Sequence, residues 1–452
     1  VELGAQIPGD GFGRGLLRAA GVTGGTLDLS QKLGGDPPTV RRVLAAVVAG
    51  AGKLRTLDLS QNKLGAEDAR ALAPALMKTT ALTSLSVANN DIVGKEAQQL
   101  AKAVLNCSSL EVLSGVPIKK LRAGKLTKLD LQGKGLGATE GIVLAELIQL
   151  SPVLENLSVA NNNIDGEAAQ QLARVVLRSA SLEVFSEIPI KKLRADALTK
   201  LDLRGVGVSG ALVLSDLLKF SAVLTSVDLR VNDIGDDGAK AIAEALKVNA
   251  VLTKLDLHYN SIGNDGAKAI AEALKVNAVL TELELGSNSI GEDGAKAIAE
   301  ALKVNAVLTT LHLDGNEIGS EGAIAIAEAL KVNAVLTSLG LNSNDIGPEG
   351  AIAIAEALKV NAVLTTLSLW ENSIGDEGAT AIAQALKVNA VVKNLHLQGN
   401  SIWDEGAIAI AEALKVNAVL TKLDIRINRM GDAGEKAVRD AVKDRSGFVL
   451  QL

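Results

Sequence analysis

Apolar residues recur along the chain at a fixed spacing of 28 residues. The frame L-x-x-L-x-L-x-x-N, seen in LTKLDLHYNSIG at 252–263, repeats without slippage through the C-terminal half. The frame starts are Leu224, Leu252, Leu280, Leu308, Leu336, Leu364, Val392 and Leu420. Within each frame apolar and polar positions alternate with period two, which predicts a short β-strand with one buried side.

A second pattern follows each strand frame. In GAKAIAEALKVNA (266–278), Ala267, Ile270, Ala271 and Leu274 have the i, i+3, i+4, i+7 spacing of one helix face. Lys268, Glu272 and Lys275 fall on the outer side, and small alanines allow neighbouring helices to pack closely. One 28-residue unit is therefore predicted to be a strand, a turn and a helix.

The N-terminal half repeats less regularly. Its frames start at Leu54, Leu82, Leu110, Leu126, Leu154, Leu182 and Leu198, with spacings of 28, 28 and 16 that occur twice and form a 72-residue super-repeat. Each 16-residue unit has room for a strand and a connection, and Pro117 and Pro189 argue against helix there. We expect these two units to lack a helix and to interrupt the helical layer.

The repeats resemble the leucine-rich repeats of the 28-residue, ribonuclease-inhibitor-like class, which also occurs in NOD-like receptors and RanGAP-type GTPase activators. The residues that carry the resemblance are the frame and the following Ile-Gly or Leu-Gly, as in LTELELGSNSIG at 280–291. The resemblance implies an α/β fold: a right-handed, curved β/α solenoid with parallel strands on the concave side and helices on the convex side. Geometry favours the same curvature, because paired strands lie about 4.8 Å apart and packed helices about 8–10 Å.

The repeats predict one domain without an internal linker. We expect an N-terminal cap at 1–26, irregular repeats at 27–223, regular repeats at 224–431 and a C-terminal cap at 432–452, where RSGFVLQL (445–452) is predicted to add a final strand. GDGFGRG (9–15) is a weak phosphate-loop signal, because no strand precedes it and no GK[ST] follows. An asparagine ends each regular frame and is predicted to satisfy turn backbone groups: Asn232, Asn260, Asn288, Asn316, Asn344, Asn372, Asn400 and Asn428.

Composition narrows the function classes. The net charge of −6 gives no electrostatic match to nucleic acid or an anionic membrane, and no apolar run is long enough to span a bilayer. The single Cys107 excludes an internal disulfide framework and fits a reducing compartment. We expect a cytoplasmic protein with no cofactor; the chain starts at Val1 without a secretory leader, and an organellar location after removal of a transit peptide stays open.

Variation among the repeats points to a binding face. Helix and turn are nearly invariant, whereas the polar positions of the strand frame, which face solvent on the concave side, change from copy to copy. Scarce residue types gather there, although aromatic residues make up only 2% of the chain. The predicted partner-binding residues are Arg230, His258, Tyr259, Glu282, Glu284, His312, Asp314, Trp370, Glu371, His396, Trp403 and Arg426.

Unselected drift is the alternative to a binding face, but drift favours small polar residues over Trp, Tyr, His and Arg. Glu282, Glu284, Asp314 and Glu371 predict a protein partner with basic surface patches. We therefore interpret the chain as a non-catalytic scaffold or adaptor that binds a protein, with a role as a subunit of a larger assembly left open.

Other functions remain as alternatives. The protein could regulate a partner enzyme, as an inhibitor or a RanGAP-like activator, or form the sensor array of a NOD-like receptor. Catalysis by the chain itself has little support, because the three histidines are 54 and 84 residues apart and Cys107 is distant from them. A designed consensus array is ranked last.

Basic clusters in the short units and isoleucines on the later helices form two further candidate surfaces. The basic clusters Lys119, Lys120, Arg122 and Lys191, Lys192, Arg194 are interpreted as solvated loops, with a second docking site as the alternative. Ile324, Ile352 and Ile408 replace the lysines of earlier helices, and we expect them to be half-buried against the next helix rather than to form an assembly surface.

Overall fold

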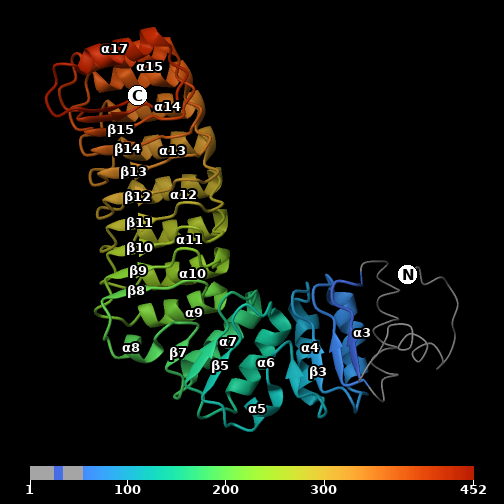
Figure 1. The fold of residues 1–452 in the computed structure, drawn as a ribbon. Helices are drawn as coiled ribbons and strands as arrows, with labels where there is room; N and C mark the ends of the chain where they lie inside the picture. The colour runs from blue at the N-terminus through green and yellow to red at the C-terminus, as the bar shows by residue number, and fades with distance from the viewer. Residues whose placement is uncertain (1–24, 34–53) are drawn as a thin grey trace. The chain divides into compact units, whose positions relative to one another are not determined.

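The computed structural model describes residues 25–33 and 54–452, and within them parallel strands alternate with helices along the chain (Figure 1). The chain divides into two compact units. One unit comprises residues 1–192 and 205–213, and the other comprises residues 193–204 and 214–452. The predicted N-terminal cap and the GDGFGRG segment lie outside the described residues, apart from the last two residues of the cap.

In the first unit the described strands form two parallel sheets, β1–β4 and β5–β7. The strands are β1 Thr26–Asp28, β2 Thr56–Asp58, β3 Ser84–Ser86, β4 Val112–Leu113, β5 Lys128–Asp130, β6 Asn156–Ser158 and β7 Val184–Phe185. The helices are α3 Ala66–Leu76, α4 Gly94–Asn106, α5 Ile118–Arg122, α6 Ala138–Ile148, α7 Gly166–Arg178 and α8 Ile190–Arg194, which the division between units crosses.

The second unit holds a ten-stranded parallel sheet, β8–β17, in sequential order. Its strands are β8 Lys200–Asp202, β9 Ser226–Asp228, β10 Lys254–Asp256, β11 Glu282–Glu284, β12 Thr310–His312, β13 Ser338–Gly340, β14 Thr366–Ser368, β15 Asn394–His396, β16 Lys422–Asp424 and β17 Val449–Gln451. Its helices are α10 Gly235–Leu246, α11 Asn264–Leu274, α12 Glu292–Leu302, α13 Gly319–Leu330, α14 Gly347–Leu358, α15 Gly375–Leu386, α16 Asp404–Leu414 and α17 Asp432–Val442; α9, Gly207–Leu218, is shared between the units.

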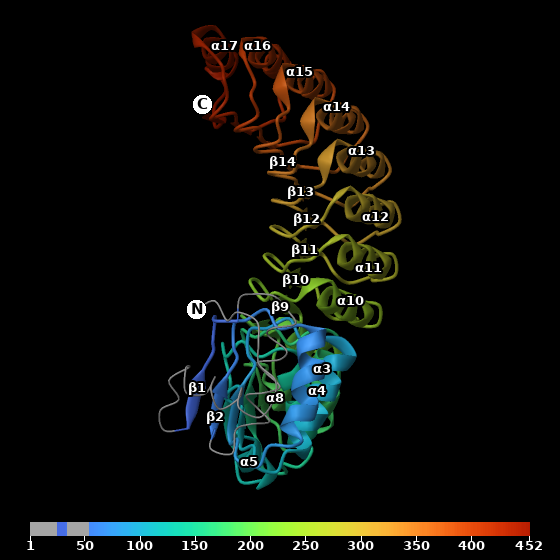
Figure 2. The same cartoon turned by 90° about the vertical axis from the view of Figure 1, so that its right-hand side faces the viewer.

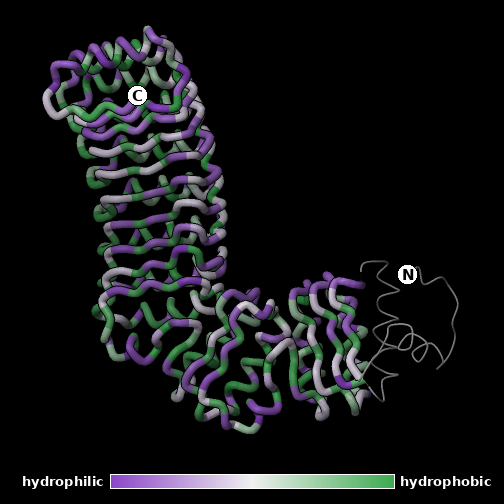
Figure 3. Tube along the Cα trace, in the orientation of Figure 1, coloured by the Kyte–Doolittle hydropathy of each residue, from purple (hydrophilic) through white to green (hydrophobic). Residues whose placement is uncertain are grey.

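The core of each regular repeat lies between the strand and the helix, as the two periodicities predict. Leu255 and Leu257 of one repeat are fully buried, as are Ile270 and Ala271 of the helix that follows. In Figure 3 hydrophobic and hydrophilic segments alternate in the same way from repeat to repeat. Small residues let the helices approach closely: a Cβ atom at Gly294 would lie only 2.9 Å from Cβ of Ala267 in the preceding helix. The β/α solenoid fold is therefore confirmed.

The prediction of helix-free 16-residue units is wrong. Each holds a five-residue helix, α5 or α8, and in α5 the side chains of Ile118 and Leu121 are buried. Pro117 occupies the N-cap, where its missing N–H leaves no helical hydrogen bond unmade. Proline therefore starts this short helix rather than preventing it.

The interruption in the first unit affects the sheet rather than the helices. Helix α4 packs against α6 across the short unit, whereas no ladder joins β4 to β5 in the described structure. Strand β4 has two residues, because the chain then turns sharply and Leu113 and Val116 pair with each other through backbone hydrogen bonds of 3.0 and 2.6 Å. The expected gap in the helical layer is thus corrected to a gap in the sheet.

The predicted final strand forms at the C-terminal end. Strand β17 pairs in parallel with β16, with Leu450 opposite Leu423. Helix α17 covers α16, and its Val438 is fully buried.

Candidate functional site

The candidate site is the strand side of the second unit. In Figure 2 helices α10–α17 follow the outer side of an arc, and the strands follow its inner side. Because side chains alternate along a strand, Leu255 points into the core while Lys254 and Asp256 face outward and remain partly exposed. The next position, His258, continues this outward face. Each repeat therefore contributes three outward columns and one further residue before the buried asparagine.

The residue before each asparagine adopts the left-handed region. The φ angles include 60° at Val231, 54° at Tyr259 and 57° at Ile427, and glycine fills the position at Gly315 and Gly399. Glycine or asparagine suits this conformation, whereas β-branched residues adopt it at a cost. We call the variable column Val231, Tyr259, Ser287, Gly315, Ser343, Glu371, Gly399 and Ile427 the left-handed column.

Three apolar members of this column are exposed to solvent. Val231 is 60% exposed, Tyr259 59% and Ile427 77%. Their side chains are not part of the core, and their backbone conformation disfavours two of them. The fold does not account for large apolar residues at these positions, so they are the strongest signal of a contact surface.

The neighbouring residues His258 and Tyr259 form one local unit. Their rings meet edge to face with centroids 4.6 Å apart. The His258 ring lies over the next repeat at Gly286, where any Cβ atom would overlap its Nδ1. A small residue at 286 thus makes room for the histidine, and Tyr259 projects beside it.

Most charged side chains at the N-terminal end of this face are paired within the chain. Arg230 lies 2.7 Å from Asp228 and 3.3 Å from Asp256, and Lys254 lies 2.8 Å from Glu282. Burial alone would raise the pKa of Asp228, but hydrogen bonds from arginine outweigh it and the pKa lies below its ordinary value. These charges therefore stabilise one another.

Aspartates at the strand ends also hold the turn. The Asp256 carboxylate accepts the backbone N–H of His258 at 3.0 Å, and Asp424 accepts both the backbone and the guanidinium of Arg426. Burial raises the pKa of Asp256. Hydrogen bonds to the turn and ion pairs thus explain why aspartate stands at these strand ends.

His312 and Glu284 form a pair between neighbouring strands, with Nδ1 2.8 Å from Oε2. This contact raises the pKa of His312, against the opposing effect of burial. Burial alone would raise the pKa of Glu284, but His312 outweighs burial and the pKa lies below its ordinary value. Beside them burial raises the pKa of Asp314, which accepts the backbone N–H of Asn342 at 2.8 Å.

Two predicted residues near the C-terminal end are less available than the sequence suggests. Trp370 is half-buried, and its ring lies against the backbone of Gly399, where a Cβ atom would be 3.2 Å from Nε1. The indole N–H is buried and makes no hydrogen bond in the described structure. His396 is also half-buried, and burial, together with nearby Lys422, lowers its pKa. Glu371 stays exposed and accepts a hydrogen bond of 3.1 Å from Ser343.

Trp403 lies away from the strand columns, at the N-cap of α16. Its backbone N–H donates to Asp376 at 2.8 Å, the same bond that glycine makes elsewhere, as at Gly263 with Asp236. The ring is 53% exposed, and Arg429 lies 5.5 Å from its centroid. Trp403 is therefore an exposed aromatic residue at the rim rather than within the columns.

The predicted structural role of the frame asparagines is confirmed. The Asn260 amide donates to the carbonyls of Leu229 at 2.7 Å and His258 at 3.1 Å, and Asn288 Oδ1 accepts the N–H groups of Asn260 and Ile262. Each amide thus links two consecutive repeats.

Sequence analysis missed a second asparagine ladder in the turn after each helix. Asn277 donates to the carbonyl of Leu246 in the preceding repeat at 2.7 Å and accepts the N–H groups of Val279 and Leu280. The ladder comprises Asn249, Asn277, Asn305, Asn333, Asn361, Asn389 and Asn417. Its signal is the invariant KVNAV segment, in which one polar residue stands among apolar neighbours.

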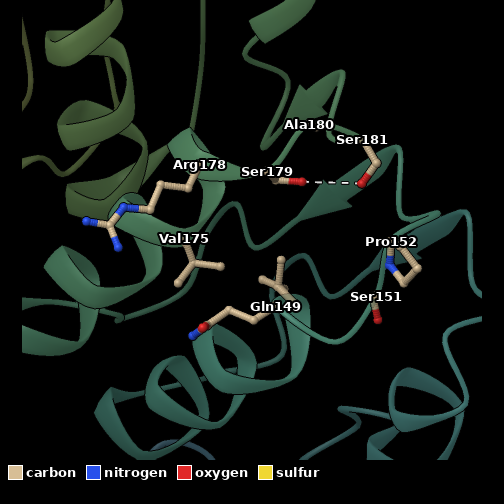
Figure 4. Close-up of a pocket in the computed structure, with 9 residues that line it drawn as sticks. Gln149, Ser151, Pro152, Val175, Arg178, Ser179, Ala180 and Ser181 are labelled. Carbon is tan, nitrogen blue, oxygen red and sulfur yellow. Dashed lines mark hydrogen bonds between the residues drawn. The ribbon is translucent and has the colours of Figure 1, made fainter.

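The first unit lacks this amide and has a pocket at the corresponding place. The pocket lies between the C-terminal ends of α6 and α7 and is drawn in Figure 4, with Arg178 at one side and Ser179 bonded to Ser181 at 3.3 Å. Ser179 occupies the ladder position, and its hydroxyl accepts the N–H of Leu182 at 3.2 Å. Its shorter side chain leaves space that an asparagine fills in the regular repeats.

The basic clusters and the helix isoleucines differ in how exposed and how paired they are. Lys119 pairs with Glu111 and Lys191 with Glu183, so the basic clusters are partly neutralised. Ile324 is half-buried as expected, whereas Ile352 and Ile408 are 38% and 41% exposed, so the half-buried interpretation holds for the first alone.

No metal site or membrane span is found within the described ranges. Residues 25–33 and 54–452 bring together no group of three or more His, Cys, Asp and Glu suited to a metal ion. In the same ranges no helix combines the length and the apolar character needed to cross a bilayer.

Comparison with known families matches eight segments to the family described as Leucine Rich repeat. The segments are 53–73, 220–243, 248–271, 276–299, 304–327, 332–355, 360–383 and 388–411. A comparison with curated protein sequences finds no match.

Several solved structures are similar at low sequence identity. An internalin from Listeria monocytogenes shares 17% identity over 78% of this chain and 92% of its own, with a TM-score of 0.37. Leiomodin-1 actin-binding site 2 shares 21% identity over 39% of this chain and 88% of its own, with a TM-score of 0.27. The C-terminal domain of tropomodulin from Caenorhabditis elegans shares 16% identity over 38% of this chain and 90% of its own, with a TM-score of 0.27.

Proposed function

The chain is a leucine-rich repeat protein, and from that premise we propose that it binds a protein partner through the strand side of its second unit. Leucine-rich repeats are interaction modules in general; which face is used and for what partner is our inference. The proposed contact residues are the predicted set: Arg230, His258, Tyr259, Glu282, Glu284, His312, Asp314, Trp370, Glu371, His396, Trp403 and Arg426, to which we add Val231 and Ile427.

One observation supports this proposal above the others. Val231, Tyr259 and Ile427 expose large apolar side chains from a backbone conformation that favours glycine. Without a contact to constrain it, this position is expected to hold glycine or asparagine, and glycine stands there at Gly315 and Gly399. Retention of a costly, exposed apolar side chain is explained by a partner that covers it.

The acidic residues on this face indicate what charge the partner carries. Glu282 and Glu284 are already paired with Lys254 and His312, so they offer little free charge. The proposed preference for basic patches therefore depends on Glu371 and Asp314. We infer a partner that combines an apolar contact with a smaller basic one.

The test exploits the left-handed backbone. Glycine at Val231, Tyr259 and Ile427 relieves the strain of about 1 kcal/mol per residue and removes the apolar contact. The triple variant is expected to keep its stability and to lose partner affinity more than tenfold in capture from native extract, measured by quantitative mass spectrometry against wild type.

The matched control removes equally exposed side chains from another surface. Met77→Ala, Val93→Ala and Leu150→Ala change three apolar side chains that are 56–59% exposed and lie in the first unit. A partner lost only by the glycine variant supports the proposed face. Partners retained equally by all three proteins would refute it. A captured enzyme whose turnover changes on addition of the purified chain would identify the regulator alternative.

A further inference from the structure

A second row of exposed apolar residues lies away from the strand side. It follows the turn after each of the helices α9 to α16, one residue per repeat; after α17 the equivalent residue is Asp444. We call it the valine row: Phe220, Val248, Val276, Val304, Val332, Val360, Val388 and Val416. The valines are 62–64% exposed and Phe220 is 80% exposed.

Folding of the turn does not require these side chains. The turn is held by the neighbouring buried amide, such as Asn249, and by the backbone bond from Val248 to Ala245 at 3.1 Å. Yet valine stands at this position in all seven regular copies, whereas exposed positions on the strand side differ from copy to copy. An exposed position that does not vary, in repeats that vary elsewhere, indicates a contact that each repeat makes in the same way.

Most lysines beside the row are paired with an acidic residue; at Lys387 the position three residues earlier is Gln384 instead of glutamate. The lysine before the valine pairs with a glutamate three residues earlier on the same helix, as in Lys247–Glu244 and Lys275–Glu272, both at 2.5 Å. The same pair recurs at Lys303–Glu300, Lys331–Glu328, Lys359–Glu356 and Lys415–Glu412. A second identical surface can therefore approach with little like-charge repulsion.

The exposed area of the row is sufficient for a stable contact. Eight side chains at these exposed fractions present on the order of 800 Å², which is about the area that one partner buries in a standard protein interface. Exposed alanines two residues after each valine, such as Ala250 and Ala278, extend the same surface.

The shape of the row identifies its occupant. The row lies in the turns that follow successive helices. Those helices follow an arc in Figure 2, so a straight helix or strand can match only part of the row. A second copy, turned over about a two-fold axis through the middle of the arc, follows the same arc in the opposite direction. We propose that the second unit forms a two-fold dimer in which the two valine rows pack antiparallel.

The ends of the row fix its register. In full overlap Phe220 of one copy meets Val416 of the other, Val248 meets Val388, and the axis passes between Val304 and Val332. Identical valines alone would allow slippage by one repeat, and the larger ring at one end distinguishes these arrangements. This inference is independent of the partner-binding face, which uses other residues.

The first test is the mass in solution by sedimentation equilibrium. Wild type is expected to be a dimer with a Kd of about 1 µM or tighter. The variant Val304→Glu, Val332→Glu, Val360→Glu is expected to have the mass of one chain, because six carboxylates would be buried at the centre. The control variant Val231→Glu, Tyr259→Glu, Ile427→Glu carries equal added charge on the strand side and is expected to remain a dimer.

Three results would overturn the proposal: wild type at the mass of one chain at about 50 µM, a dimeric row variant, or dissociation of the control as well. Circular dichroism of each variant shows that the exposed changes leave the fold intact.

The second test measures the register by disulfide formation, in a Cys107→Ala background. A mixture of Val248→Cys and Val388→Cys chains is expected to form a disulfide between copies, whereas Val248→Cys alone is not. Crosslinking of Val248→Cys to itself would overturn the antiparallel arrangement. Since neither test uses the strand-side partner, failure of the proposed function and failure of the dimer are separately visible.

Discussion

On the strand side, the size of side chain that fits at a position depends on the residue one repeat away. Large side chains at His258 and Trp370 lie over glycines of the following repeat, Gly286 and Gly399. Residues on this face therefore vary partly in pairs, because a bulky residue in one repeat requires a small residue in the next. Large residues that do not lie over a glycine of the next repeat, such as Tyr259, remain exposed and can contact a partner.

Gly399 provides a residue-scale prediction, because its φ of 68° opposes a side chain and a new Cβ atom would lie 2.9 Å from Cγ of Glu371 and 3.2 Å from the Trp370 ring. Gly399→Ala is expected to reduce the free energy of unfolding by about 2–3 kcal/mol. Gly375→Ala is the matched control, since φ is 65° but no atom lies within 4 Å of the new Cβ, and about 1 kcal/mol is expected. Urea unfolding measures both changes.

Trp370 fluorescence supplies the independent readout in a Trp403→Phe background. Displacement of the ring should shift its emission in Gly399→Ala and leave it unchanged in Gly375→Ala. Equal energetic costs with no spectral shift would mean that the backbone alone explains Gly399.

At the scale of the element, buried amides fasten both turns of each regular repeat. One asparagine ladder closes the turn after the strand, and the other closes the turn after the helix. Both donate to a carbonyl of the preceding repeat, as Asn260 does to Leu229 and Asn277 to Leu246. Repeats are therefore joined by buried hydrogen bonds at both ends of the helix as well as by the core.

Substitution of Asn277 tests the second ladder. Asn277→Ala leaves the carbonyl of Leu246 and the N–H of Leu280 without their partner, and a loss of about 2–4 kcal/mol is expected in urea unfolding. Asn277→Ser is expected to cost less, because a serine hydroxyl accepts the leucine N–H at this position in native repeats, as Ser221 does from Leu224 at 3.3 Å. Equal losses in both variants would contradict this assignment.

At the scale of the molecule, stability is distributed along the array. Each strand pairs only with its sequence neighbours within its sheet, and adjacent helices pack on one another. Such a solenoid gains stability from contacts between successive repeats, so a local defect weakens the nearest repeats most.

Removal of one core leucine tests this local coupling. Leu311 in β12 is fully buried, and Leu311→Ala is expected to cost about 2–5 kcal/mol. Hydrogen exchange read by mass spectrometry should rise most in peptides of β11–β13 and decline toward β17. Leu157→Ala in β6 is the matched change in the first unit, where exchange should rise in β5–β7. A uniform rise along the second unit in Leu311→Ala would instead show one all-or-none block.

Much of the fold was predictable because its signals are local. Period two marks the strands, helical spacing marks the helices, and both recur at fixed intervals, so repeat boundaries and buried leucines followed directly. The short units were mispredicted because Pro117 was interpreted as a helix breaker, although at an N-cap it is compatible with α5. The break in the sheet was also missed, because a two-residue strand leaves no distinct pattern.

The candidate site was predictable in position but not in detail. Variable frame positions do face outward, as at Tyr259 and Glu371, but Trp370 is half-buried and Glu284 is already paired with His312. The valine row was not predicted, because the sequence alone does not show that the invariant Val304 and its equivalents are exposed.

The sequence by itself determined the repeat, its strand and helix, its core and the positions of the frame asparagines, because each is marked by a pattern that lies within one 28-residue period. Only the tertiary structure decided which outward residues are available. Their partners stand about 28 residues away, as His312 does from Glu284 and Gly399 from Trp370. Such contacts arise when neighbouring repeats stack, and stacking distance, backbone conformation and burial are properties of the array rather than of any one segment.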